Sequence, residues 1–183
     1  MACNSINLAS IARDCDPNVG GIKKVWLHPW VEGIFSLDSG NTGVSGVTVD
    51  ATTASTGAGW YTFEFRRGTG SLTSNLNIDD ANGVNFIQSD LVLQFSRMET
   101  AKRTSVAALA VAEVAGIVLD NNGKYWALGF NEPMSSSAGV GQTGTARTDG
   151  NNYQVTLSDF SQSYPYEVDA DAVAALKIAS DNA

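Results

Sequence analysis

Short segments with apolar residues at every second position constrain the fold of this chain more than any other feature of its sequence. In the segment 60–66, the aromatic residues Tyr61, Phe63 and Phe65 alternate with polar ones. Successive side chains of a strand point to opposite faces, so this period of two predicts a half-buried β-strand. Similar patterns and short apolar runs predict further strands at 22–28, 72–78, 84–95, 117–119, 125–128 and 153–157.

Turn signals separate these segments. The chain has 18 glycines, and the pairs Asn82-Gly83 and Asn122-Gly123 are each typical of a tight β-hairpin. Hydrophobic residues make up 43% of the 183 residues, which is enough for a core. The sequence therefore predicts a mainly β fold, a β-sandwich or barrel.

One flanking α-helix is expected at about 97–115, where Ser96 and Glu99 have the spacing of a capping box and an Ala-rich stretch follows. Residues 1–21 are expected to form an N-terminal arm. The sandwich or barrel domain is expected at 22–169, and residues 170–183 as a tail or short helix. Within the domain, 36–59 is interpreted as a long loop or hairpin that reaches a neighbour. The segments 131–152 and 160–169 are interpreted as irregular.

The charge balance argues against several partner classes. Eleven basic and nineteen acidic residues give a net charge of -8, and the basic residues cluster only in short pairs. A nucleic-acid-binding protein normally carries a basic patch, so tight DNA binding is not expected.

No stretch has the roughly 18 apolar residues that cross a membrane, and the N-terminus lacks a signal-peptide pattern. Cys3 and Cys15 are expected to be reduced thiols of a protein made in a cytoplasm.

Two motifs resemble parts of known sites but lack the sequence context that such sites need. The run Gly139–Gly144 matches G-x-G-x-x-G, but a dinucleotide site needs a strand before it and a helix after it, and TARTDGNNY does not open a helix. These glycines are interpreted as part of a loop or bulge. His28 is the only histidine, and it is interpreted as structural because nothing in the sequence provides a partner for catalysis or metal binding.

Acidic turns and tryptophans leave two alternatives open. Three Gly-containing turns carry Asp or Asn side chains that could bind calcium, but none has the full ligand spacing, so stabilisation of the turns is preferred. Four tryptophans could form a sugar-stacking platform, although core and subunit interface are preferred. No catalytic, cofactor-binding or metal residue is assigned, and the chain is not expected to be an enzyme. These turns and tryptophans are Asp79, Asp80 and Asn82; Asp120 and Asn122; Asp149, Asn151 and Asn152; and Trp26, Trp30, Trp60 and Trp126.

Three stretches together resemble a known family. They are RDCDPNVGGIKKVWL at 13–27, DDANGVNFIQSDLVLQFSRMETAKRTSVAALA at 79–110, and VLDNNGKYWALGF followed by GQTGTARTDGNNYQVTLSDF at 118–130 and 141–160. In this order they are similar to tail tube and related virion structural proteins of bacteriophages, particularly those of Bacteroidota-like hosts. The segments 36–60 and 131–138 depart from the pattern.

The resemblance implies a self-assembling subunit. Tail tube proteins have a sandwich or barrel with a flanking helix, and they form hexameric rings that stack into a hollow conduit for DNA ejection. The partners of such a subunit would be copies of itself and other phage tail proteins, with DNA as passing cargo. The subunit would be located in the virion tail, which is assembled in the cytoplasm of the host. Six copies with a net charge of -8 each would carry a total charge of -48, and a negatively charged lumen would let a polyanion pass without binding. The alternatives are a capsid decoration or head–tail joining protein, or a carbohydrate-binding β-sandwich.

Overall fold

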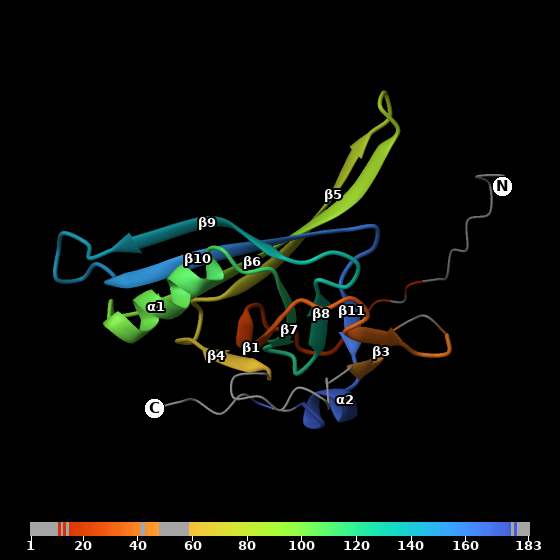
Figure 1. Ribbon diagram of the computed structural model, residues 1–183, viewed down its shortest axis with the longest axis horizontal. Coiled ribbons are helices and arrows are strands. Elements are labelled where there is room, and N and C mark those ends of the chain that lie inside the picture. Colours follow the sequence, from red (N-terminus) through yellow and green to blue (C-terminus); the bar gives the residue numbers. More distant parts are fainter. Residues whose placement is uncertain are drawn as a thin grey trace.

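The computed structural model describes residues 11, 13, 15–40, 43–47, 59–176 and 178, which fold into two β-sheets and two short helices (Figure 1). The helices are α1 (Thr100–Leu109) and α2 (Ala170–Ala174). The larger sheet has seven strands in the order β2 (Phe35–Leu37), β3 (Gly43–Val47), β11 (Tyr166–Val168), β8 (Tyr125–Leu128), β7 (Val114–Asp120), β1 (Ile22–Pro29) and β4 (Tyr61–Glu64). The smaller sheet has four strands in the order β5 (Ser71–Asp79), β6 (Val84–Ser96), β10 (Asn152–Ser161) and β9 (Ser135–Gln142).

The main core lies between the two sheets, which confirms the expected sandwich. Leu91 and Leu93 of β6 and Leu157 of β10 are fully buried there, opposite Leu27 and Val118 of the larger sheet. Removing these branched side chains from water stabilises the fold by about 1.5–3 kcal/mol each. Helix α1 places Leu109 and Val106 in the same cluster, at the inner side of the smaller sheet.

A second apolar cluster covers the other face of the larger sheet. It gathers Trp60, Ile34 and Phe35 with Ala172 of α2. Strand β7 is consequently buried on both faces along Val114–Val118. This explains why its sequence reads as a continuous apolar run without alternation.

Both Asn-Gly pairs form the expected hairpin turns. Gly83 joins β5 to β6 with φ +65°, and Gly123 joins β7 to β8 with φ +86°. Each turn is fixed by the Asp before it. The carboxylate of Asp79 accepts from the backbone N–H groups of Ala81 and Asn82, and that of Asp120 accepts from Lys124 N–H at 2.8 Å.

Replacing Gly83 by Ala is expected to lower the free energy of unfolding by about 1–2 kcal/mol, because φ +65° is unfavourable for a residue with a Cβ. A Cβ at this position meets no atom within 4 Å, so backbone strain is the only cost. Gly20→Ala is the matched control: it also points into open space, but its φ lies outside the left-handed region. Urea denaturation should show a loss for Gly83→Ala alone, and equal effects would contradict this explanation.

The expected helix at 97–115 is too long at both ends. Arg97 has φ +68°, and the helix begins after Glu99, whose side chain does not cap it. The predicted capping box of Ser96 and Glu99 is therefore wrong. At the other end the chain leaves the helix after Leu109, because residues from 114 onward pair with β1 and β8.

Other segments are more regular than expected. Within 131–152, the residues Ser135–Gln142 form β9, and within 160–169 the residues Tyr166–Val168 form β11. Of the expected loop 36–59, residues 43–47 form β3, which pairs with β2 and β11, while 41–42 and 48–58 lie outside the described residues. The short terminal helix is α2, and residues 177 and 179–183 are also outside the description.

The described end of the expected N-terminal arm lies against the β7–β8 turn. Val19 N–H donates to Asn122 Oδ1 at 2.8 Å, and Asn121 Nδ2 donates to the carbonyl of Gly20 at 2.6 Å. The chain is thus fixed to the sandwich just before β1 begins. Residues 1–10, 12 and 14 of the arm lie outside the described residues.

Candidate functional site

One face of the four-stranded sheet is turned away from the rest of the described chain (Figure 1). Along β6, residues 87, 89, 91, 93 and 95 are buried toward the core, and the residues between them point outward. The pairing register extends this alternation to the neighbouring strands, because Leu157 lies opposite Leu91 and Ser158 opposite Asp90. The outward side chains of β5, β6 and β10 are Ser71, Thr73, Asn75 and Asn77; Phe86, Gln88, Asp90, Val92 and Gln94; and Gln154, Thr156, Ser158 and Phe160.

Hydrogen bonds hold the middle of this outer face in place. The carboxylate of Asp90 accepts from Gln88 Nε2 at 3.1 and 3.2 Å and from the Ser158 hydroxyl at 2.6 Å. The Ser158 hydroxyl also meets that of Ser137 at 2.8 Å. Three strands are thereby joined through side chains. The face offers amides and hydroxyls in a fixed arrangement, with one carboxylate at its centre.

The outer face carries no positive charge. None of the strands β5, β6, β9 and β10 contains Lys, Arg or His. Proteins that hold nucleic acid do so by neutralising phosphates with Lys and Arg. A polyanion that meets these four strands would find neutral polar and apolar side chains and the carboxylates of Asp90 and Asp79.

The two edge strands of this sheet are offset along the strand direction. β5 pairs with the Val84–Val92 part of β6. β9 reaches the level of the opposite end of β6, because Gln142 of β9 pairs with Asn152 of β10, and Asn152 pairs with Ser96 of β6. The β5–β6 and β9–β10 hairpins consequently extend from the body in opposite directions (Figure 1). Closed β-barrels require strands that are tilted and offset in this way.

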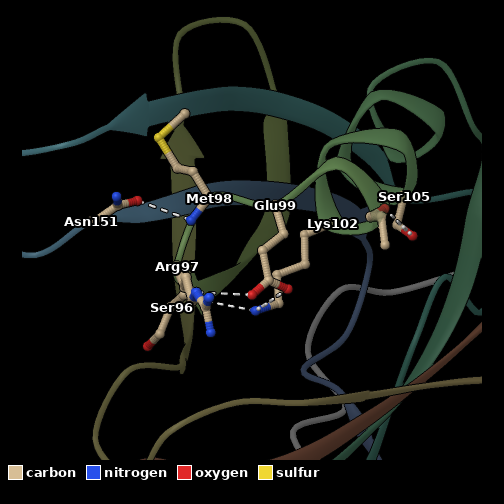
Figure 2. A network of polar contacts seen from close by, with 8 residues as sticks. Ser96, Arg97, Met98, Glu99, Lys102, Ser105 and Asn151 are labelled. Carbon is tan, nitrogen blue, oxygen red and sulfur yellow. Dashed lines mark hydrogen bonds and ion pairs between the residues drawn. The ribbon is translucent and has the colours of Figure 1, made fainter.

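A polar network joins the end of β6, the start of α1 and the β9–β10 turn (Figure 2). Asn151 accepts from Met98 N–H through Oδ1 at 2.9 Å and from Arg97 N–H through its carbonyl at 2.7 Å. Glu99 pairs with Arg97 at 3.1 Å and with Lys102 at 3.4 Å, and Lys102 also donates to the Ser96 carbonyl at 2.8 Å. These contacts hold Arg97 in its left-handed conformation.

The residues weighed as sites in the sequence do not come together. Gly139 and Gly141 lie in β9, and Gly144 lies in the turn that follows with φ +71°. A strand, β10, comes next instead of a helix, so the geometry of a dinucleotide site is lacking. His28 is half-buried in β1, with Nδ1 2.6 Å from the Pro29 carbonyl and its ring 5.3 Å from that of Trp60.

In each acidic turn one carboxylate, that of Asp79, Asp120 or Asp149, accepts hydrogen bonds from backbone N–H groups of its own turn. Asp149 accepts from the backbone N–H groups of Ala146 and Thr145, each at 2.7 Å, and these bonds hold the pKa of its carboxyl below the ordinary value. Hydrogen bonds from Asn82 do the same for Asp79. In the described part of the chain, no three His, Cys, Asp or Glu side chains gather closely enough to hold a metal ion.

The tryptophans do not form an exposed row. Trp60 and Trp26 are buried, and Trp30 and Trp126 are half-buried. The Trp30 indole N–H donates to the Gly129 carbonyl at 3.0 Å, and that of Trp126 donates to Asp120 at 3.1 Å. All four therefore serve the packing of the larger sheet and its turns.

Sequence reasoning did not single out Asp159. It lies on β10 opposite Ser89, on the inner face, and is 4% exposed. Burial raises the pKa of Asp159 to about 6, although a hydrogen bond from Gly129 N–H opposes the shift, and the charge of Glu132 adds to it. In the sequence, Asp159 is an acidic residue that follows Val155, Leu157 and Ser158. The period of two alone does not show that its carboxylate is buried.

No protein-family model, curated protein or solved structure matches this chain. Among the described residues, no helix is long and apolar enough to cross a membrane.

Proposed function

We propose that this protein is the tail tube subunit of a bacteriophage, and that its copies form rings that stack into a hollow conduit for DNA. The observation that carries the proposal is the outer face of the four-stranded sheet, which the described residues leave uncovered, which is ordered by hydrogen bonds, and whose strands contain no Lys, Arg or His. Lining the conduit with this face would let DNA pass without being held.

The edges of the same sheet supply a way to build the ring. β5 has 9 residues and β9 has 8, and the described chain pairs neither strand on its outer side. Pairing β5 of one copy with β9 of the next would remove both exposed edges. Because the two edges are offset, strands in the closed wall would be tilted, as in β-barrels.

The resemblance stated above supplies the remaining parts of the proposal: hexameric rings, other tail proteins as further partners, assembly in the host cytoplasm and a final place in the virion. The sandwich with helix α1 at its flank fits that resemblance. A contact that repeats head to tail would continue the rings into a filament of stacked copies.

Negative-stain electron microscopy of the purified protein at increasing concentration tests this proposal. Rings with a central hole, and tubes built from them, are expected, because both edges and both hairpins are available for contact. A DNA-binding measurement at physiological salt should give no tight complex. Monomers at every concentration, or nanomolar DNA binding, would contradict the proposal. Single rings that decorate another particle would instead favour a different virion component.

A further inference from the structure

Two turns of the described chain carry an exposed asparagine that is followed by glycine. Asn82-Gly83 lies between β5 and β6, and Asn122-Gly123 lies between β7 and β8. In such a pair the backbone nitrogen of the glycine can attack the side-chain amide of the asparagine, because glycine has no side chain that blocks the approach. Asparagine is accordingly one of the thermolabile residues of proteins. Since both asparagines are exposed, the contacts of each turn decide its reactivity.

The Asn122 side chain is held at both ends. Its Oδ1 accepts from Val19 N–H at 2.8 Å, and its Nδ2 donates to Asn18 Oδ1 at 2.9 Å. The Gly123 N–H, which would be the nucleophile, already donates to the Asp120 carbonyl at 3.3 Å. Reaction at this turn therefore requires that the arm leaves it and that the turn itself opens.

The Asn82 side chain is held at one end only. Its Nδ2 donates to Asp79 Oδ2 at 2.6 Å, and no group of the described residues donates to its Oδ1. Within the same part of the chain, Gly83 N–H has no hydrogen-bond acceptor. The space around Gly83 is also open, because a Cβ there would meet no atom within 4 Å. The attacking nitrogen and the amide carbon are thus free of competing contacts.

The turn that carries Asn82 lies where the smaller sheet has only two strands. β10 ends its pairing with β6 at Ile87, so residues 84–86 have only β5 beside them. The hairpin extends from the body of the protein at this end (Figure 1). Segments with few buried contacts open locally at a low cost in free energy. Asn82 can therefore reach the reactive conformation while the sandwich stays folded.

We propose that Asn82 is a site of spontaneous deamidation, and that the contacts of Asn122 with residues 18 and 19 protect the second Asn-Gly pair. The Gly83 nitrogen gives its proton to solvent base and forms a bond to Cγ of Asn82, the Cγ–Nδ2 bond breaks, and ammonia leaves. Water then opens the resulting cyclic imide at either carbonyl carbon, which gives an aspartate or an isoaspartate at position 82. The net reaction consumes water and releases ammonia, and it needs no other reactant.

The reaction places a second carboxylate in the β5–β6 turn. Before it, the bond from the Asn82 side chain is the largest cause of the lowered pKa of Asp79. Afterwards a negatively charged oxygen replaces the donor, so the pKa of Asp79 should rise and a bond that orders the turn is lost. The end of the hairpin gains charge with time in the free subunit, so this inference does not depend on the tail tube proposal.

Peptide mapping by mass spectrometry tests the proposal on the full chain, kept folded in mildly alkaline buffer. The two Asn-Gly pairs fall in different tryptic peptides. The mass increase of about 1 Da that marks deamidation should accumulate at Asn82 at least about ten-fold faster than at Asn122, because Asn122 must first lose additional hydrogen bonds. In urea, where both turns are unfolded, the two rates should agree within about three-fold.

The variant Asn18→Ala measures the protecting contact directly. It removes the acceptor of Asn122 Nδ2, so deamidation at Asn122 should become about three-fold faster. The rate at Asn82 in the same molecules should stay unchanged and is the internal control. Equal rates at the two pairs in the folded wild type, or reaction at Asn82 only in urea, would overturn the proposal. Selective reaction at Asn82 without an effect of Asn18→Ala would overturn the protecting role of the arm.

Discussion

Replacing Leu157 by Ala should lower the free energy of unfolding by about 3–4 kcal/mol. Leu157 lies on β10 directly opposite Leu91 of β6, and both side chains are fully buried between the sheets. Truncation removes apolar contacts and leaves a cavity in the layer that holds the four-stranded sheet on the larger one. The site cannot collapse easily, because its neighbours are fixed in two hydrogen-bonded sheets.

Urea denaturation followed by tryptophan fluorescence measures this effect, since all four tryptophans belong to the larger sheet and its surroundings. Val140→Ala is the control, because Val140 lies on the edge strand β9 and is 55% exposed. The control should change the free energy of unfolding by less than about 0.5 kcal/mol. A loss below about 1 kcal/mol for Leu157→Ala would contradict a tightly packed sandwich.

Replacing Asp159 by Asn should stabilise the protein by about 2–3 kcal/mol at pH 7.5. The folded protein raises the pKa of Asp159 from 3.8 to about 6 because the carboxylate is buried between the sheets. Above pH 6 the native state must therefore hold a desolvated negative charge, with Oδ1 lacking a hydrogen-bond partner. Asn has nearly the same shape, carries no charge, and can still accept from Gly129 N–H.

The pH dependence follows from the direction of that shift. Since the folded state binds the proton more tightly than the unfolded chain, the stabilisation from Asp159 is complete below pH 3.8 and is lost as pH rises to 6. The gain from Asp159→Asn should thus be largest above pH 6 and should vanish near pH 3.8. Stability curves from pH 3.5 to 8 measure it.

Glu132→Gln serves as the control for this prediction. The charge of Glu132 makes only a smaller contribution to the raised pKa of Asp159, after burial. The control should therefore keep most of the fall in stability between pH 4 and 6. If Asp159→Asn and wild type show parallel curves over that range, the carboxylate is not buried as described.

The strands with large alternating side chains were predictable from the sequence. β4, β6 and β10 lie where the apolar period of two places them, β1 lies where a short apolar run predicted a strand, and both Asn-Gly turns connect the expected strands. In each case the signal is local, because alternate side chains of one strand fill the same core. The sandwich could be inferred for that reason, although the order of the strands could not.

β9 and the end of helix α1 differ from the prediction because their structure depends on distant residues. The sequence of β9, SSSAGVGQ, does not alternate between apolar and polar residues. The strand forms because it pairs with β10, and because Gly141 has no side chain that would crowd the Tyr153 ring. The helix was extended to 115 because Ala and Val at 112–115 suit a helix as well as a strand. Residues from 114 onward form a strand instead, because β7 pairs with β1 on one side and with β8 on the other.

The candidate surfaces were less accessible to sequence reasoning than the fold. The absence of Lys and Arg from four strands is visible in the sequence, but which face of the sheet stays uncovered is decided by the packing of β6 and β10 on the larger sheet. The family resemblance predicts self-assembly without locating the outer face of the four-stranded sheet.

The central claim is that the outer face of the four-stranded sheet lines a hollow interior. A cryo-electron microscopy map of the assembled protein, at a resolution that separates strands, tests it directly. The account predicts β5, β6, β10 and β9 at the inner wall, with Gln88, Asp90 and Ser158 facing the cavity. A map that places these three residues on the outside of the particle, or against a neighbouring subunit, would contradict it.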